Sequence, residues 1–241
     1  MLLRHWLVSL LAGFIAALFA TPAPARTIDV PGDCGSIQVA IDIAVDGDTV
    51  FVHISDDPYA EDLEINGKSI TLRGESQLEV AVDGTLNVDV SMWQEVSVEE
   101  MQIFGGISAT GSRGGAVLRH LHILDHFEAS VGGGYVTLLD VCSLSLDSGE
   151  HAEVGPLTNV TANGLLVLGR TDPPRFAFRN RGGSLTFTGS SLSGFQIGVV
   201  NVEGGVTTFD ATTTFSDIAA PLLNLCGSGD IAGVSWFNCM P

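Results

Sequence analysis

The third position of a recurring frame, apolar-x-x-apolar-x-apolar, holds Glu100, His120 and Asp140 at spacings of 20 residues, and Asn159 19 residues later. If successive repeats stack, a carboxylate, an imidazole and a second carboxylate become neighbours in one column. A histidine whose pKa is set by flanking carboxylates suits general acid–base catalysis. The alternative is a structural ladder of polar side chains that hydrogen-bond between repeats and to the turn backbone, and this ladder is the expected arrangement.

Arg119 comes directly before the histidine of this column, and Glu99 holds the equivalent place one repeat earlier. We expect an ion pair between them, with a catalytic arginine as the alternative. His120 and His122 lie on one face of a strand because strand side chains alternate. With a nearby acid such as Asp125 they offer an alternative zinc site, although solvated or ladder histidines are the simpler expectation.

A basic stretch at residues 170–181, RTDPPRFAFRNR, is the candidate ligand site of this very acidic chain. Its candidate binding residues are Arg170, Arg175, Phe176, Phe178, Arg179 and Arg181. Guanidinium groups bind carboxylates through paired hydrogen bonds, so the stretch predicts a site for acidic polysaccharide. In the alternative interpretation the phenylalanines belong to the core and the arginines offset surrounding acids. The same question applies to Trp93 and Tyr135, which either face solvent as sugar platforms or pack inside.

The stretch SDDPYAEDLE, residues 55–64, makes calcium a possible cofactor. Its acids are Asp56, Asp57, Glu61, Asp62 and Glu64. Calcium prefers carboxylate and carbonyl oxygens, but the alternating Asp/Asn pattern of a calcium loop is absent. We therefore expect a solvated acidic edge here.

The repeats that carry these residues predict an all-β solenoid. The frame starts at Val98, Leu118, Leu138 and Leu157, and weaker copies start at Phe187 and Phe209. Self-similarity at about 20 residues is typical of solenoids, in which each repeat covers the apolar face of the next. Glycine turns interrupt every repeat, and valine, phenylalanine and methionine replace leucine freely. This favours coils of short parallel strands over leucine-rich repeats, with room for roughly eight coils.

Helical periodicity occurs once, near the start of the chain. The apolar stripe consists of Ile37, Ala40, Ile41 and Ala44. Ser36 is placed as the N-cap, and about ten residues of helix are marginal alone. We therefore expect a short helix that covers the open end of the solenoid, where a free strand edge would otherwise invite aggregation.

The stretch TIDVPGDCGSIQVAIDIAVDGDTVFVHISDDPYAEDLEINGKSITLRG resembles the N-terminal segment of right-handed parallel β-helix proteins of the pectin-lyase-like superfamily. The matching pieces are DGDTV at 46–50, the Tyr-x-Glu-x-Leu-x-Ile pattern at 59–65, and KSITLRG at 68–74. The resemblance covers about 48 residues and departs from the family in DDPY, where PGxY is usual. It implies a single-stranded right-handed parallel β-helix with an N-terminal helical cap. The family includes lyases, esterases, epimerases and binding proteins, so the resemblance does not decide the function.

Residues 1–25 are interpreted as a signal peptide, with a positive Arg4, an apolar run and the small-residue pattern Ala23-Pro24-Ala25. We therefore expect a secreted or periplasmic protein without a transmembrane segment after cleavage. Removal of Arg4 changes the net charge from −18 to −19. Such a charge excludes nucleic acids and anionic membrane surfaces as expected partners.

Export permits disulfides among Cys34, Cys142, Cys226 and Cys239. We expect Cys226–Cys239, because they are close together at the chain end. The pairing of Cys34 and Cys142 stays open. The expected divisions are a signal peptide at 1–25, an N-terminal cap at 26–48, a parallel β-helix at 49–222 and a C-terminal cap at 223–241, with Trp236 and Phe237 as an apolar lid.

The expected function is binding or display at the cell envelope, without catalysis, and with acidic polysaccharide as the ligand. The alternative is a polysaccharide lyase or esterase that acts on uronate-containing glycans. In that case Glu100, His120, Asp140 and Arg119 are the candidate catalytic residues. The oligomeric state does not follow from the sequence.

Overall fold

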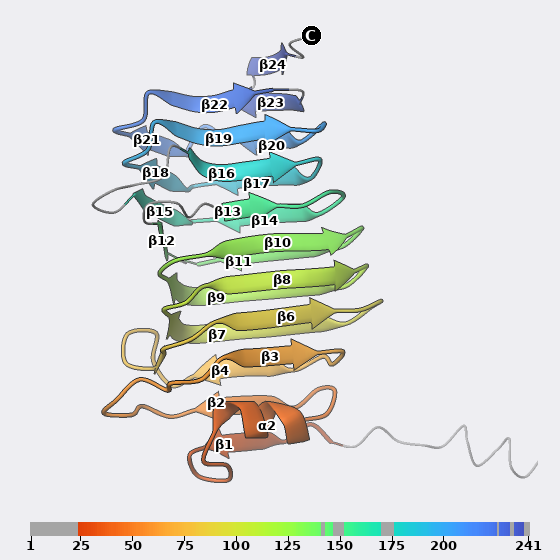
Figure 1. Cartoon of the computed structure of the whole chain (residues 1–241), viewed down its shortest axis with the longest axis vertical. Coiled ribbons are helices and arrows are strands. Elements are labelled where there is room, and N and C mark those ends of the chain that lie inside the picture. The colour runs from red at the N-terminus through yellow and green to blue at the C-terminus, as the bar shows by residue number, and fades with distance from the viewer. Residues whose placement is uncertain are drawn as a thin grey trace, which may run out of the picture.

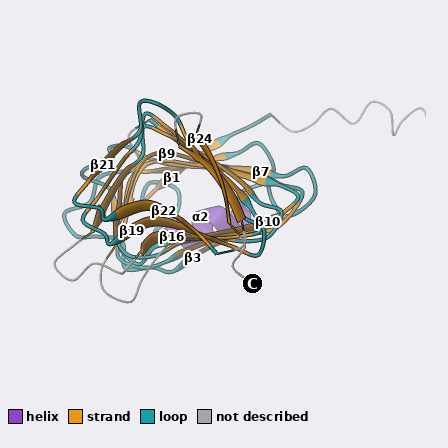
Figure 2. Ribbon diagram, turned by 90° about the horizontal axis from the view of Figure 1, so that it is seen from above, coloured by secondary structure: helices purple, strands orange, loops and turns teal. Residues whose placement is uncertain are grey.

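The structure is a computed structural model that describes residues 24–140, 143–146, 152–169, 176–225, 227–231 and 234–238. The chain winds into a parallel β-solenoid of about eight turns, and 56% of the structure is strand. Among the described residues there is one short helix, α2 (Ile37–Ile43). Figure 1 shows the strands stacked as successive rungs, and Figure 2 shows the closed cross-section. The predicted all-β parallel solenoid with a short N-terminal helix is confirmed.

Two sheets of 16 and 8 strands form the walls. The main path of the first sheet is β1 (Thr27–Val30), β2 (Thr49–Val52), β4 (Thr71–Gly74), β7 (Glu95–Ile103), β9 (Gly115–Ile123), β11 (Tyr135–Leu139), β14 (Asn159–Asn163), β17 (Ser184–Thr188), β20 (Val206–Phe209), β23 (Gly227–Ile231) and β24 (Val234–Asn238). A side branch contains β5 (Ala81–Val82), β12 (Ser143–Leu146), β15 (Leu166–Gly169), β18 (Ser191–Ser193) and β21 (Thr214–Ser216). The second sheet contains β3 (Leu63–Asn66), β6 (Leu86–Val90), β8 (Ile107–Ser112), β10 (Phe127–Gly132), β13 (Ala152–Val154), β16 (Phe176–Arg181), β19 (Ile197–Val202) and β22 (Ala220–Asn224).

Two recurring corners carry most of the described non-glycine residues that have a positive φ. At the first corner, between the second sheet and the first, Trp93, Arg113 and Leu157 have φ of 67°, 57° and 57°. At the second corner, where β7 and β9 bend toward the side branch, Glu100 and His120 have φ of 58° and 49°. These left-handed conformations are strained for residues with a Cβ and normally favour glycine.

The strands are held in register by inward-facing apolar side chains. Val98, Leu118, Leu138 and Ala162 align on consecutive rungs and are buried. Short and long side chains therefore stack along the core with the rung spacing of about 4.8 Å. The frame copies that start at Phe187 and Phe209 also pair in register.

The predicted repeat that begins at Leu157 is wrong by several residues. Asn159 pairs with Tyr135, and the rung above Leu138 is occupied by Ala162, so that Gly164 and not Asn159 continues the column of Asp140. Leu157 is itself a first-corner residue, 73% exposed. The corner requires a positive φ, which Gly164 (69°) adopts without strain, and this decides between two apolar frames that fit the sequence equally well.

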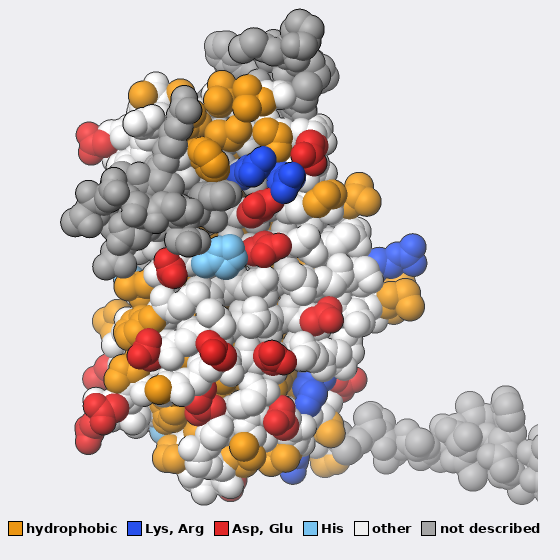
Figure 3. Space-filling view, viewed as in Figure 1, with side chains coloured by type: hydrophobic (Ala, Val, Ile, Leu, Met, Phe, Trp, Pro, Cys, Tyr) orange, Lys and Arg blue, Asp and Glu red, His pale blue; other side chains and the backbone are white. Residues whose placement is uncertain are grey.

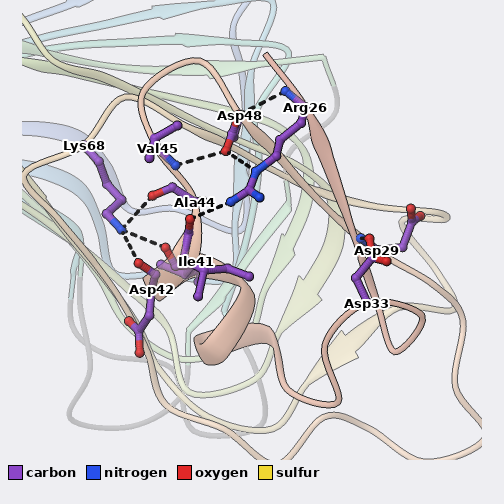
Figure 4. A network of polar contacts seen from close by, with 10 residues as sticks. Arg26, Asp29, Asp33, Ile41, Asp42, Ala44, Val45, Asp48 and Lys68 are labelled. Atoms are coloured by element: carbon purple, nitrogen blue, oxygen red, sulfur yellow. Dashed lines mark hydrogen bonds and ion pairs between the residues drawn. The ribbon is translucent and has the colours of Figure 1, made fainter. Parts of the chain in front are cut away.

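Helix α2 covers the first rungs, as its apolar stripe predicts. Ile37, Ala40 and Ile41 are buried, and the Glu61 carboxylate accepts hydrogen bonds from the Ile37 and Gln38 amides at 3.1 and 3.0 Å. At the other end Lys68 Nζ donates to the carbonyls of residues 41, 42 and 44 at 2.8–3.1 Å (Figure 4). A short helix thus has an anion at its N-terminus and a cation at its C-terminus, both favourable to its dipole.

Asp48 fastens the start of the chain to the turn after α2. Its buried carboxylate accepts from the Arg26 backbone N–H and Nε, both at 3.0 Å, and from the Val45 N–H at 3.0 Å (Figure 4). The pKa of Asp48 is lowered, chiefly by the hydrogen bond from the Arg26 backbone. The carboxylate therefore remains charged and ties residues 26 and 45 together.

The β-structure extends beyond the expected limits of the solenoid. β1 already pairs in parallel with β2, so the first rung lies inside residues 26–48. β23 pairs in parallel with β20 before β24 turns back antiparallel to β23. Cys142, Cys226 and Cys239 lie outside the described residues, as do the side chains of Trp236 and Phe237, whereas Cys34 is a buried free thiol. Within the described chain, no helix has the length and apolarity to cross a membrane.

His53 bridges three consecutive rungs near the N-terminal end of the solenoid. Its Nε2 lies 3.0 Å from Asp29 Oδ1 and its Nδ1 lies 3.3 Å from Glu75 Oε2. Glu75 also accepts the Ile54 N–H at 3.1 Å. The imidazole is thus placed between two carboxylates, one on each neighbouring rung.

This arrangement predicts a pH-dependent contribution to stability. The pKa of His53 is raised, chiefly by its hydrogen bond to Asp29, from an ordinary value of 6.5. The stabilisation is therefore fully present below the unfolded pKa and is lost as pH rises through the higher folded pKa. The pKa of Glu75 is lowered, chiefly by the Ile54 N–H, so its contribution is lost instead as pH falls through the depressed value.

The thermal midpoints of wild type and His53→Gln measure this contribution. We expect the difference in midpoint to be largest near pH 6 and to shrink toward about pH 9, where the imidazole is neutral. His126→Gln is the matched control, because the distance from His126 Nε2 to Glu128 Oε2 is 3.8 Å, longer than either carboxylate contact of His53. A difference in midpoint that stays constant over this pH range would show that the ion pairs of His53 with Asp29 and Glu75 do not stabilise the fold.

Candidate functional site

The structure brings Glu100, His120 and Asp140 together at the second corner. The register places them on three consecutive rungs, and His120 Nδ1 lies 2.7 Å from Glu100 Oε1, with both side chains part-exposed. Asp140 has the same left-handed backbone, with φ of 55°. A histidine bonded to a carboxylate through Nδ1 keeps Nε2 for a second partner, so this pair has the form of an oriented base.

Arg119 does not form the predicted pair with Glu99. Its Nε lies 3.9 Å from Asp140 Oδ2, and Glu99 Oε1 instead accepts from Ser97 Oγ at 2.8 Å. Among the described residues Arg119 Nε is buried without a hydrogen-bond partner. Leu139 is the register partner of Arg119 on the following rung, so the contact of Arg119 with Asp140 is a diagonal one.

In the part of the chain that is described, the structure shows no set of ligands for the predicted zinc or calcium site. There, no group of three or more His, Cys, Asp or Glu side chains is placed to hold a metal ion. Burial lowers the pKa of His122. Glu61 caps α2, and Asp62 Oδ1 accepts from the Thr85 N–H and Oγ1 at 2.8 and 2.9 Å. These two acids of the 55–64 stretch therefore have structural partners.

The basic stretch divides between core and surface. Phe178 is fully buried, with its ring edge-on to Phe187 at 5.3 Å, so it is a core residue and not a sugar platform. Arg181 bonds Glu153 Oε1 at 3.2 Å and Glu203 Oε1 at 3.3 Å, as the mixed charges over β16 in Figure 3 illustrate. Phe176 and Arg179 are part-exposed, and Arg170 and Arg175 lie outside the described residues. Glutamates on the two neighbouring rungs thus neutralise Arg181.

The two other aromatic candidates face solvent and meet in one groove. Trp93 is 86% exposed and Tyr135 is 39% exposed. They line a hollow of about 320 Å³ at the first corner, together with Gln94, Glu95, Arg113, Gly114, Gly133, Gly134 and Asn159. Glycines form much of this lining, and the missing side chains leave the space open. We call this hollow the Trp93 groove. In Figure 3, basic and apolar side chains project from the matching edge of the solenoid.

Tyr135 lies across the sheet because Gly115 makes room for its ring. Tyr135, Gly115 and Glu95 occupy one row on three rungs, and a Cβ on Gly115 would lie 2.2 Å from the ring carbon Cζ. The hydroxyl reaches over Gly115 to donate a hydrogen bond to Glu95. This bond raises the pKa of Tyr135 to about 12, so the phenol stays protonated and the ring is held in place.

The first corner keeps large side chains where glycine would cost less. Trp93 and Arg113 have positive φ, whereas Gly133 and Gly182 occupy equivalent corners with φ of 74° and 71°. Strained non-glycine residues of this kind cost of order 1–3 kcal/mol and concentrate at functional sites. Sequence analysis identified Trp93 and Tyr135 only as aromatic candidates and missed Arg113 and Glu95. The sequence signal that could have identified the groove is the alignment of Trp93 and Arg113 with Gly133 of the VGGGY stretch in successive repeats.

No protein-family model, curated protein or solved structure matches this chain. The chain is a parallel β-solenoid. That assignment rests on the pairing of its strands. Since one fold carries many unrelated functions, the Trp93 groove and the second corner are the features that indicate what this protein does.

Proposed function

We propose that the protein is an exported right-handed β-helix, related to the pectin-lyase-like superfamily, that binds acidic polysaccharide in the Trp93 groove at the cell envelope. The observation that carries the proposal is the convergence of two exposed aromatic rings and one arginine on a single groove. Aromatic faces pack against the apolar faces of sugar rings while their edges stay hydrated, and a guanidinium recognises carboxylates. The ring of Tyr135 is preorganised, which lowers the cost of binding.

Charge supports an acidic ligand at this groove in an otherwise acidic protein. Arg26 pairs with Asp48, Lys68 bonds carbonyls of α2, and Arg181 lies between two glutamates. Within the described residues, Arg113 has no ion-pair partner. It is the basic side chain of the groove, whose lining also includes the Glu95 carboxylate that accepts the Tyr135 hydroxyl.

The position of Arg26 supports cleavage of the leader directly before this residue. The Arg26 backbone nitrogen already donates to Asp48 Oδ1 at 3.0 Å. Cleavage there would replace the amide by an α-ammonium group beside a buried carboxylate, which strengthens the interaction. N-terminal sequencing of the exported protein tests this, and a mature chain that starts elsewhere would contradict it.

A glycan array probed with the purified protein, with and without calcium, tests the ligand class. We expect binding to uronate-containing glycans and little binding to neutral chains of the same linkage. Arg113→Gln is expected to reduce this preference about tenfold, since a charge-assisted hydrogen bond is lost. A blank array, or equal binding of neutral and acidic glycans, would overturn the proposal.

The second corner supports a second candidate, a lyase or esterase for the same polymers. The hydrogen bond between His120 and Glu100 is the specific observation in its favour. In that case the protein would turn over a polyuronate, and His120→Ala would abolish turnover while binding in the Trp93 groove persists. Absence of turnover on every glycan bound by the array would exclude this candidate.

A further inference from the structure

We propose that two copies of this protein associate in antiparallel orientation along the first corner and form a reversible homodimer. The inference goes beyond the proposed function and does not depend on the identity of any ligand. It rests on the order of large side chains and glycines along this corner, which complements itself under one two-fold rotation.

One position of the first corner recurs on six consecutive rungs. It lies two residues before a row of the first sheet that consists of Glu95, Gly115, Tyr135, Asn159, Ser184 and Val206. The residues at this position all have a positive φ, between 57° and 85°, and are Trp93, Arg113, Gly133, Leu157, Gly182 and Gly204. We call them the corner column, which follows the right-hand edge of the stack in Figure 1. At about 4.8 Å per rung, its two ends are about 24 Å apart.

A repeated β-turn places these residues in equivalent positions. The amides of Gln94, Gly134, Thr158 and Gly205 each donate a hydrogen bond to the carbonyl three residues earlier. The column residue is the third of each turn, where some turn types require a positive φ. Gly204 at one end therefore has the same place in its turn as Trp93 at the other.

Three members of the corner column carry large exposed side chains, and three are glycines. Trp93 is 86% exposed and Leu157 is 73% exposed, and Arg113 is exposed as well. A Cβ on Gly204 would meet nothing within 4 Å, and a Cβ on Gly133 would meet only Arg113 Cγ, at 3.7 Å. The first, second and fourth rungs thus project from the corner, whereas the third and sixth leave open space.

A two-fold rotation that reverses the solenoid axis places every large side chain opposite a glycine. Its centre lies between the third and fourth rungs of the column. The opposed pairs are Trp93 with Gly204, Arg113 with Gly182, and Leu157 with Gly133 of the second copy. A parallel two-fold would instead place each residue opposite itself, so that large side chains collide and glycines face gaps. Since a two-fold interface must be self-complementary, only the antiparallel arrangement fits this corner.

Arg113 also meets complementary charge on the second copy. Next to Gly182 lies Arg181, which bonds Glu153 at 3.2 Å and Glu203 at 3.3 Å, so that one positive charge lies between two negative ones. The Glu203 side chain is 61% exposed, and Arg113 has no ion-pair partner among the described residues. Arg113 therefore offsets the remaining negative charge. The Debye length of about 8 Å at physiological ionic strength limits repulsion between the more distant acids of the two copies.

The size of this interface predicts a weak dimer. A strip about 24 Å long belongs to the class of transient contacts that bury less than about 1,200 Å² in total, and we expect a Kd of order 100 µM. Tryptophan and arginine are the side chains that most often dominate such contacts. Because Trp93 cannot contact a second copy and a sugar at once, a ligand in the Trp93 groove favours the monomer. Ligand titrations at about 10 µM protein, well below this Kd, measure the monomer.

Sedimentation velocity of the purified protein from about 10 µM to 1 mM tests the inference, and we expect wild type to change from monomer to dimer over this range. Leu157→Gly leaves glycine opposite glycine, and Gly133→Leu places leucine opposite leucine, so each should weaken association about tenfold or more. The double variant again places a leucine opposite a glycine and should restore the Kd to within about threefold of wild type. Leu78→Gly is the matched control, because it removes a leucine that is 74% exposed and lies outside the corner column.

The outcomes decide both association and orientation. Wild type that stays monomeric at about 1 mM overturns the inference, as does a dimer that both single variants leave intact. A dimer strengthened by Gly133→Leu indicates parallel copies and overturns it, and so does a double variant that fails to restore association. Thermal midpoints within a few degrees of wild type show that each variant is folded. If Gly133→Leu does not fold, Leu157→Gly and Arg113→Glu decide, and a dimer that survives both overturns the inference.

Discussion

Trp93→Gly is expected to stabilise the fold and at the same time to remove most ligand binding. The backbone of Trp93 has φ of 67° and the side chain is 86% exposed, so its removal relieves strain without loss of buried area. We expect a gain of about 1 kcal/mol in the free energy of unfolding. Binding should weaken by about 2 kcal/mol, roughly 30-fold, as for the loss of an aromatic anchor.

Urea denaturation and calorimetric titration with an acidic oligosaccharide measure the two effects. Leu157→Gly is the matched control, because Leu157 has the same strained backbone (φ 57°) but does not line the groove. Leu157→Gly should gain similar stability and bind the same acidic oligosaccharide as tightly as wild type. A Trp93→Gly variant that is less stable than wild type, or that binds as tightly, would show that this corner is not strained for the sake of a ligand.

Phe187→Ala is expected to lower the free energy of unfolding by about 3–5 kcal/mol, the usual cost of removing a buried phenylalanine ring. Phe187 is fully buried. Its ring is stacked on Phe209 at 5.0 Å and lies edge-on to Phe178 at 5.3 Å. The three residues come from β17, β20 and β16, so the cavity would weaken contacts between adjacent rungs and between the two sheets.

The loss should also be localised along the solenoid. Each rung contacts mainly its neighbours, so stability is roughly a sum of rung and interface contributions. Amide exchange in Phe187→Ala should therefore accelerate most in β14, β17 and β20 and least in β1 to β4. Phe187→Leu, which keeps most of the volume, should cost clearly less. Uniform acceleration over all rungs, or a cost below about 1 kcal/mol for the alanine variant, would contradict this account.

The local sequence pattern was sufficient to predict an element wherever the spacing of its apolar residues fits one type of secondary structure. The stripe of Ile37, Ala40 and Ile41 predicted α2 because a 3.6-residue period places these side chains on one face. The apolar frames at Val98, Leu118 and Leu138 predicted the stacked rungs because parallel pairing aligns equivalent residues. The frame at Leu157 failed because two apolar alignments fit, and only the positive φ required at Gly164 distinguishes them.

Residue types and their periods were thus sufficient to predict the solenoid, its helical cap and the column of Glu100, His120 and Asp140. Tertiary structure alone decided which aromatic rings reach solvent, since burial of Phe178 and exposure of Trp93 depend on rung register and corner geometry. Tertiary structure also creates the Trp93 groove. Its lining residues are about 20 positions apart in the chain and become neighbours only because successive rungs stack at about 4.8 Å. Side-chain types and periods are local properties, whereas a site built across rungs depends on how the whole chain is wound.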